Sequence, residues 1–146
     1  MTVEEMNPTA AEYNRLRKSV GWSEFQEEYV EDSLARNLYC VTLHEGGNVV
    51  GMGRIIGDKR LVFIIQDVIV APDRQGRGYG RAIMEFLMAY VYAHSIDNTY
   101  VGLMAAVGKE AFYEKFDFVR RPNDRFGAGM VQFIKKDRMI PTDGSK

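Results

Sequence analysis

Residues 61–87 read LVFIIQDVIVAPDRQGRGYGRAIMEFL, an apolar run that meets a glycine-rich turn and then an amphipathic segment. Residues 61–70 are rich in β-branched and aromatic side chains, which predicts a buried central strand that ends at Ala71-Pro72-Asp73. Beyond the turn, apolar residues recur at the spacing of a helix with one apolar face: Ile83, Phe86, Leu87, Tyr90 and Val91. The turn therefore leads from a strand directly to the N-terminus of a helix.

The turn itself, QGRGYG at residues 75–80, is suited to binding an anion. Residues without a Cβ let backbone N–H groups converge on a ligand, and the helix dipole adds positive potential. A Walker loop would need a lysine at Arg81, and a dinucleotide turn would need a small residue at Arg81 or Ile83. A purely structural connection would not explain why arginines flank the glycines. We therefore expect the turn to hold a phosphate or pyrophosphate.

Length and charge restrict the class of protein. The 146 residues predict one domain spanning 1–146, with residues 141–146 as a flexible tail. A net charge of −1 argues against nucleic-acid and anionic-membrane partners, and no apolar run approaches the roughly 20 residues of a membrane span. No secretion signal is evident, and the lone Cys40 predicts a packed thiol rather than a disulfide, which is compatible with a cytoplasmic location.

Periodicity and capping residues predict the remaining elements. Helices are expected over residues 9–18, 24–37 and 108–116, the first with Thr9 and Glu12 forming a capping box. Strands are expected over residues 38–44, 48–56, 100–105 and 130–134, and a short strand before Thr9 is weakly indicated. Glu45-Gly46-Gly47 predicts a hairpin turn, so an antiparallel meander should lead into the strand at 61–70.

Asp67-Val68-Ile69-Val70-Ala71-Pro72, together with the turn at 75–80, resembles the GCN5-related N-acetyltransferase (GNAT) superfamily. In that superfamily the acetyl-coenzyme A turn Gln/Arg-x-x-Gly-x-Gly/Ala follows a strand of the form Asp-x-x-Val-x-Pro, and the order of elements matches over nearly the whole chain. The resemblance implies an α/β (α+β) fold with a mixed, mostly antiparallel sheet of about six to seven strands and about four helices. It also implies that the sheet splays at the acetyl-coenzyme A site.

The same resemblance assigns the cofactor contacts to backbone groups. Val68, Ile69 and Val70 would present N–H and C=O groups to the pantetheine arm and the acetyl carbonyl, at a bulge in the strand. The pyrophosphate of acetyl-coenzyme A would be held by the residues of the turn: Gln75, Gly76, Arg77, Gly78, Tyr79, Gly80 and Arg81. No metal ion is implied, and no cluster of metal ligands is evident in the sequence.

The resemblance places Tyr113 with its hydroxyl towards the thioester sulfur, as the general acid that protonates the leaving thiolate. A phenol with a pKa of about 10 suits this reaction without a large shift. The turn that follows has Asp117 where the family usually has glycine, which implies a left-handed residue that carries a side chain. Ala106 stands where many relatives have an asparagine that contacts the pantetheine.

The acceptor side is less defined by the sequence. Asp67 could hold the ammonium of an acceptor or relay its proton through water, or it could pair structurally with Arg54. Trp22 could form a wall of the acceptor pocket, or it could be a core residue of the helix pair. Trp22 favours an aromatic amine, Asp67 a polyamine, and Arg54 an acceptor that bears a carboxylate.

Together these features predict an N-acetyltransferase that moves an acetyl group from acetyl-coenzyme A to the primary amine of a small molecule, by direct attack in a ternary complex. Two alternatives stay open: a non-catalytic acyl-coenzyme A binding or sensing module, and acetylation of a protein amine. A homodimer that covers the edge strand at 130–134 is also expected.

Overall fold

The computed structural model describes residues 1–137 of the chain. These residues form two compact units, one over Met1–Met104 and one that begins at Ala105. The flexible tail predicted for residues 141–146 lies outside the described residues. That the whole chain is one domain stays a prediction.

The first unit is built on a five-stranded sheet in the order β1-β2-β3-β4-β5. Its strands are β1 (Thr2–Glu4), β2 (Tyr39–Glu45), β3 (Asn48–Gly57), β4 (Val62–Val70) and β5 (Tyr100–Gly102). The first four are antiparallel neighbours, whereas β5 runs parallel to β4. The mixed, mostly antiparallel α/β sheet and the meander into β4 are therefore confirmed, with slightly fewer strands in the described residues than predicted.

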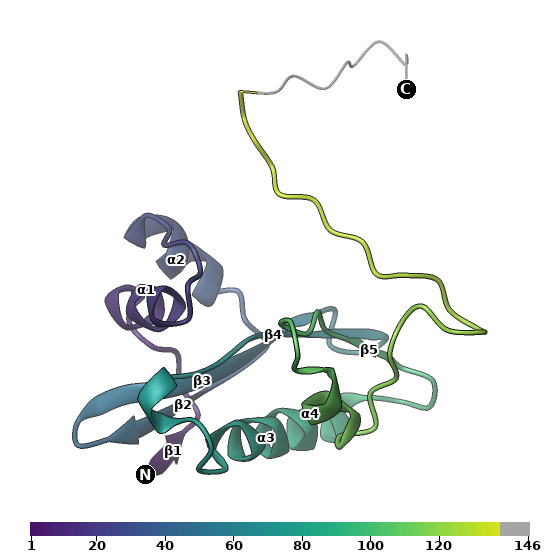
Figure 1. Ribbon diagram of the computed structural model, residues 1–146, viewed down its shortest axis with the longest axis horizontal. Coiled ribbons are helices and arrows are strands. Elements are labelled where there is room, and N and C mark those ends of the chain that lie inside the picture. The colour runs from purple at the N-terminus through teal and green to yellow at the C-terminus, as the bar shows by residue number, and fades with distance from the viewer. Residues whose placement is uncertain (138–146) are drawn as a thin grey trace. The chain divides into compact units, whose positions relative to one another are not determined.

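Helices cover both faces of this sheet (Figure 1). Helices α1 (Ala10–Ser19) and α2 (Glu27–Leu34) lie on one face, and α3 (Tyr79–His94) lies on the other. The core under α1 and α2 is formed by side chains from both layers: Ala10, Tyr13, Leu16, Val30, Leu34, Cys40, Val49, Met52 and Ile69. On α3 the predicted apolar positions Ile83, Leu87 and Val91 are buried, whereas Phe86 is exposed and Met84 takes part in the core instead.

The first helix begins as predicted, and the second begins later. Thr9 and Glu12 form both hydrogen bonds of the capping box, which confirms the start of α1. The second helix was predicted from residue 24, but α2 starts only at Glu27. The side chain of Asn14 binds the backbone N–H and C=O of Phe25, at 3.1 and 2.7 Å, and this pairing holds the backbone of Phe25 outside the helix.

The second unit contains α4 (Glu110–Glu114), which is shorter than the helix predicted over residues 108–116. The strand predicted at residues 130–134 is wrong, because these residues have no regular structure. Their apolar side chains Met130, Val131, Phe133 and Ile134 are 64% to 88% exposed. Since strand propensity produces a strand only where a neighbouring backbone accepts the ladder, the pattern alone was insufficient. The homodimer expected to cover this strand loses that argument and stays a prediction.

Candidate functional site

The strand that precedes the glycine turn is interrupted at Asp67. Met52 pairs with Ile69 and Arg54 pairs with Gln66, so Gly53 alone faces two residues of β4. Asp67 takes a left-handed backbone conformation with φ of 52° at this point. One extra residue in one strand of an antiparallel pair is a β-bulge. The bulge implied by the resemblance is therefore present immediately before Val68.

Gly53 lets α3 approach the sheet beneath this bulge. A Cβ on Gly53 would lie 2.5 Å from Cγ2 of Ile83 and 2.9 Å from Cδ1 of Leu87, which is closer than carbon atoms can pack. Any larger residue at Gly53 would push the helix away from the sheet. The bulge and the helix that carries the turn are thus held in one arrangement.

Beyond the bulge, one edge of β4 is open. Strand β5 pairs with β4 only from Val62 to Ile64, and it ends at Gly102. In the described part of the chain no strand continues this pairing along residues 65–70 of β4. Val68, Ile69 and Val70 therefore have no neighbouring strand on that side, and their backbone groups there can bind a ligand.

The turn after β4 has the geometry of an anion site. Pro72–Arg74 forms a short 3₁₀ turn, and Gly76 and Gly78 are left-handed, with φ of 78° and 80°. Apart from their immediate chain neighbours, no atom of residues 1–137 lies within 4 Å of a Cβ built on Gly76 or Gly78, so the space over these glycines is open. Gly78 is the N-cap of α3 and provides no side-chain cap, so the first-turn N–H groups are available to an anion.

The charges around the turn are partly compensated. Glu45, at the end of β2, accepts hydrogen bonds from Nε of Arg74 at 2.8 Å and from the hydroxyl of Tyr79. Nε of Arg81 lies 2.9 Å from Oε1 of Glu85, one helical turn further along α3. Within residues 1–137, Arg77 takes part in no ion pair. The side chain of Gln75 donates to the carbonyl oxygen of Val70 at 3.1 Å and so ties the turn to the end of β4.

Asp67 lies in a buried ionic cluster on the opposite face, under α1. Its Oδ2 accepts hydrogen bonds from Nε of Arg54 at 2.8 Å and from the hydroxyl of Tyr13 at 2.7 Å. Its Oδ1 accepts from Nη1 of Arg17 at 3.1 Å, and its side chain is only 1% exposed. The structural pair with Arg54, one of the two roles that the sequence left open for Asp67, is thus present.

Arg17, which the sequence analysis missed, is surrounded by aromatic rings. Its guanidinium lies 5.7 Å from the ring centroid of Tyr13, 5.4 Å from that of Trp22 and 5.0 Å from that of Phe25. Trp22 also packs against the core, as expected for a core residue of the helix pair. Its second possible role, as a wall of the acceptor pocket, stays a prediction. Tyr13 and Arg17 are four residues apart and share one face of α1, which is the signal that could have identified the pair.

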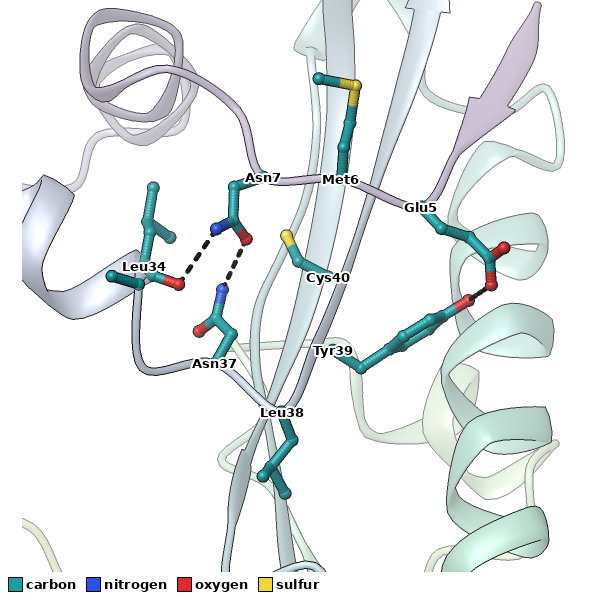
Figure 2. A pocket seen from close by; sticks show the side chains of 9 residues that line it. Glu5, Met6, Asn7, Leu34, Asn37, Leu38, Tyr39 and Cys40 are labelled. Carbon is teal, nitrogen blue, oxygen red and sulfur yellow. Dashed lines mark hydrogen bonds between the residues drawn. The ribbon is translucent and has the colours of Figure 1, made fainter.

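Arg54 is held from its other side by a polar network that reaches a surface pocket. Its Nη1 donates to Oδ1 of Asn37 at 2.9 Å and to Oγ of Ser33 at 3.3 Å. Asn37 donates in turn to Asn7, whose side chain donates to the carbonyl oxygen of Leu34 (Figure 2). Arg54 is therefore held in position by Asp67 on β4 and by Ser33 and Asn37 on and after α2.

That pocket has a volume of about 290 Å³ and lies where the segment before α1 meets the segment after α2. It is lined by Glu5, Met6, Asn7, Leu34, Ala35, Asn37, Leu38, Tyr39 and Cys40. The thiol of Cys40 points towards Met6 and Asn7 in Figure 2. Burial raises the pKa of this thiol to about 12, so it stays protonated, and the predicted packed thiol is confirmed.

Burial and the adjacent carboxylate of Asp67 also raise the pKa of Tyr13, to about 12. The phenol therefore keeps its proton and donates it to Asp67 in a hydrogen bond throughout the physiological range. The charged groups that contribute to this shift are Asp67, Arg54 and Arg17. One carboxylate and two guanidinium groups give the cluster a formal charge of +1.

Tyr113 belongs to the second unit, where α4 carries it. Its ring meets those of Phe112 and Phe118 edge to face, with centroids 5.0 and 6.3 Å apart. Burial raises the pKa of Tyr113, which keeps the phenol protonated. Asp117 has φ of 69°, so the left-handed residue expected after this helix is present despite its side chain.

Within residues 1–137, no three His, Cys, Asp or Glu side chains lie close enough together to bind a metal ion. None of the helices in the same residues has the length and apolar character needed to cross a membrane.

The chain is similar to known acetyltransferases in sequence and in structure. The family described as "Acetyltransferase (GNAT) domain" matches residues 35–120, which is more than half of the chain. Among solved structures, a Staphylococcus aureus protein of unknown function, described as a probable acetyltransferase, is 36% identical, with a TM-score of 0.83 over 90% of this chain and 98% of that one. The Arabidopsis thaliana glucosamine-6-phosphate N-acetyltransferase is 17% identical, with a TM-score of 0.67 over 92% and 100%, and shows the fold alone.

Curated relatives are more distant and longer. Serotonin N-acetyltransferase 2 of Oryza sativa subsp. japonica, described as chloroplastic, is 31% identical over 75% of this chain and 48% of its own length. The uncharacterized N-acetyltransferase ycf52 of Porphyra purpurea is 28% identical over 77% and 66%. The chain thus spans about half to two thirds of the length of these relatives. On the family match and the shared fold together, the chain belongs to the GNAT acetyltransferases.

Proposed function

We propose that the chain is an acetyl-coenzyme A-dependent N-acetyltransferase whose acceptor is the primary amine of a small molecule. The observation that carries the proposal is the open edge of β4 after the bulge at Asp67, followed at once by the left-handed glycines Gly76 and Gly78. GNAT proteins use acetyl-coenzyme A, and the residues fit it. Free backbone groups on residues 68–70 suit the amide-bearing pantetheine, and the open turn suits the pyrophosphate.

The chemistry is a direct transfer within a ternary complex. The neutral amine attacks the thioester carbonyl, a C–N bond forms, and the C–S bond breaks. Negative charge collects on the carbonyl oxygen in the transition state, where a preorganised backbone N–H stabilises it. We assign this role to the backbone after the bulge, because the bulge frees these groups from the sheet ladder.

Two protons move in the reaction. The leaving thiolate needs one, and we assign it to the hydroxyl of Tyr113, whose raised pKa keeps it in the donor form. The nitrogen of the attacking amine becomes cationic as the C–N bond forms, and it loses the other proton, which passes to water. Asp67 was the candidate acceptor of this proton, but both of its oxygens already accept hydrogen bonds from cationic or phenolic donors. These contacts support a structural role for Asp67, in which its carboxylate holds the guanidinium of Arg54 in position.

A small acceptor is supported by the aromatic side chains that surround Arg17, which contacts Asp67 at the bulge. The turn after α1 and the start of the next segment place Trp22 and Phe25 next to Arg17, within a compact group of side chains. The name of the rice relative gives serotonin, a small primary amine, as its acceptor. Because the chain spans only about half of that protein, the identity of the acceptor does not follow from the relative.

The test is release of free thiol from acetyl-coenzyme A in the presence of a panel of amines, with mass spectrometry of the acetylated product. The proposal expects thiol release that depends on a small primary amine, with one acetyl group transferred for each thiol released. Binding of acetyl-coenzyme A without amine-dependent release would favour a sensing module. Release that required a protein or peptide amine would overturn the small-molecule acceptor.

A further inference from the structure

We infer that the acceptor carries its own anionic group, a carboxylate or a phosphate, and that Arg17 and Arg54 bind this group. The inference rests on the proposed function and specifies the class of amine. Both guanidinium groups belong to the ionic cluster around Asp67, and this cluster immediately precedes Val68 along β4. An acceptor anchored there would lie beside the backbone to which we assign the acetyl carbonyl.

The cluster around Asp67 carries a net positive charge. The cluster holds two guanidinium groups and one carboxylate, and Tyr13 remains neutral because its pKa is raised to about 12. The formal charge is thus +1 in a place that is largely shielded from solvent, and its complement is an anion.

Both arginines keep hydrogen-bond donors that residues 1–137 do not use. Arg17 uses Nε to bind the carbonyl oxygen of Ser23 at 2.7 Å and Nη1 to bind Asp67. Arg54 likewise uses Nε for Asp67 and Nη1 for Asn37 and Ser33. Within residues 1–137, Nη2 of Arg17 and Nη2 of Arg54 make no hydrogen bond to a protein acceptor. Each arginine is therefore fixed in place and keeps donors for a ligand.

The arginines are more exposed than the carboxylate that they bind. The side chains of Arg17 and Arg54 are 15% and 11% exposed, while that of Asp67 is 1% exposed. The surface of the cluster is thus cationic, and its carboxylate lies beneath. Three aromatic rings, those of Tyr13, Trp22 and Phe25, surround Arg17 and limit its movement. An ammonium or polyamine approaching this surface would meet guanidinium groups before it met Asp67.

This arrangement also helps the chemistry without a dedicated base. A positive charge close to an ammonium disfavours its protonated form and lowers its pKa. An acceptor held by its carboxylate or phosphate would bring its amine near two guanidinium groups. A larger fraction of the amine would then be neutral, which is the form that attacks the thioester.

The test compares acceptors that differ only in the anion. We propose thiol-release kinetics for amino acids against their carboxamides and for phosphoethanolamine against ethanolamine, with serotonin and a diamine as acceptors without an anion. The inference expects kcat/KM to be higher for the anionic member of at least one pair, roughly tenfold or more. The pair that shows the preference distinguishes a carboxylate from a phosphate. A preference for neutral amines or diamines would overturn the inference and leave the acetyltransferase function intact, whereas no release with any amine would overturn the function itself.

Substitution of Arg17 tests whether this residue binds the anionic group of the acceptor. Arg17→Gln should raise the KM of the preferred anionic acceptor about ten- to hundredfold, with little change in the KM of acetyl-coenzyme A or of neutral acceptors. Arg17→Lys should restore part of the affinity because it restores the charge. The matched control is Arg36→Gln, which removes an arginine from an exposed ion pair with Asp32 on α2. If Arg17→Gln, shown to be folded by circular dichroism, left the KM of the anionic acceptor unchanged, the arginines would not bind it.

Discussion

Asp67 and Arg54 form a buried ion pair across neighbouring strands, with Oδ2 of the carboxylate 2.8 Å from Nε of the guanidinium. The pair lies where β4 bulges, because Asp67 is the residue whose left-handed φ of 52° produces the extra residue. Arg17 and Tyr13 complete the coordination of the same carboxylate from α1. One side chain thus connects the first helix, β3 and the bulge that opens the candidate cofactor site.

Asp67→Asn should lower the free energy of unfolding by about 3–5 kcal/mol, because it leaves two guanidinium groups close together without their counter-ion. Urea unfolding at neutral pH measures this. Asp32→Asn is the control, since it breaks the exposed pair with Arg36 and should change stability by less than about 1 kcal/mol. Normal stability of Asp67→Asn, with a shifted pH–rate profile, would instead identify Asp67 as a catalytic base.

Tyr13→Phe should change how stability depends on alkaline pH. The pKa of Tyr13 is raised from 10 to about 12, so its contribution is fully present below pH 10 and is lost as the pH rises towards 12. The parent should therefore lose about 2–3 kcal/mol more than the variant between these pH values. Unfolding curves across this interval measure the difference.

Tyr92→Phe is the matched control for this measurement, because Tyr92 is 69% exposed on α3. Other buried tyrosines add to the alkaline loss of the parent, and the comparison between variants cancels their contribution. Identical pH dependence in Tyr13→Phe and the parent would show that the hydrogen bond to Asp67 adds nothing.

Gly78→Val should weaken the binding of coenzyme A by about tenfold or more, because a side chain would occupy the open space beside the first-turn N–H groups. The left-handed φ of Gly78 also adds strain of about 1–3 kcal/mol to the folded state. Calorimetry with coenzyme A measures the affinity.

Gly46→Val separates strain from binding. Gly46 is also left-handed and open, but it lies in the hairpin turn between β2 and β3. It should lose comparable stability and keep its affinity for coenzyme A. Equal loss of affinity in the two variants would mean that strain alone is responsible, and the turn would no longer be the pyrophosphate site.

Tyr113→Phe should keep the affinity for acetyl-coenzyme A and slow turnover by roughly 10²–10⁴-fold, because only the donor to the thiolate is removed. The edge-to-face contacts of the ring with Phe112 and Phe118 are retained in this variant. Single-turnover kinetics at saturating amine isolate the chemical step. A rate within a factor of about two of the parent would assign the proton to water.

The strand, the turn and α3 could be predicted because their signals are local. The alternation of glycines with φ near 80° at Gly76 and Gly78, the apolar spacing on α3 and the capping box at Thr9 depend on residues close together in the chain. The hairpin turn at Gly46-Gly47 was evident for the same reason, since both residues adopt positive φ.

The acceptor side could not be predicted in the same way because its contacts are distant in sequence. Asp67 meets Tyr13 and Arg17 across 54 and 50 residues, and no short motif indicates such a cluster. The delayed start of α2 depends on the side chain of Asn14, eleven residues before Phe25. The strand predicted at residues 130–134 failed because apolar and β-branched content cannot show whether a partner strand exists.

The central claim is that the backbone of residues 67–70 and 76–81 forms the coenzyme A site. Amide chemical-shift changes in a titration with coenzyme A test it most directly, because they report each N–H group separately. We predict that the largest changes fall on these residues, with smaller ones at Arg17 and Trp22. Saturable binding whose largest changes fall elsewhere, with the amides of the bulge and the glycine turn unmoved, would contradict the account.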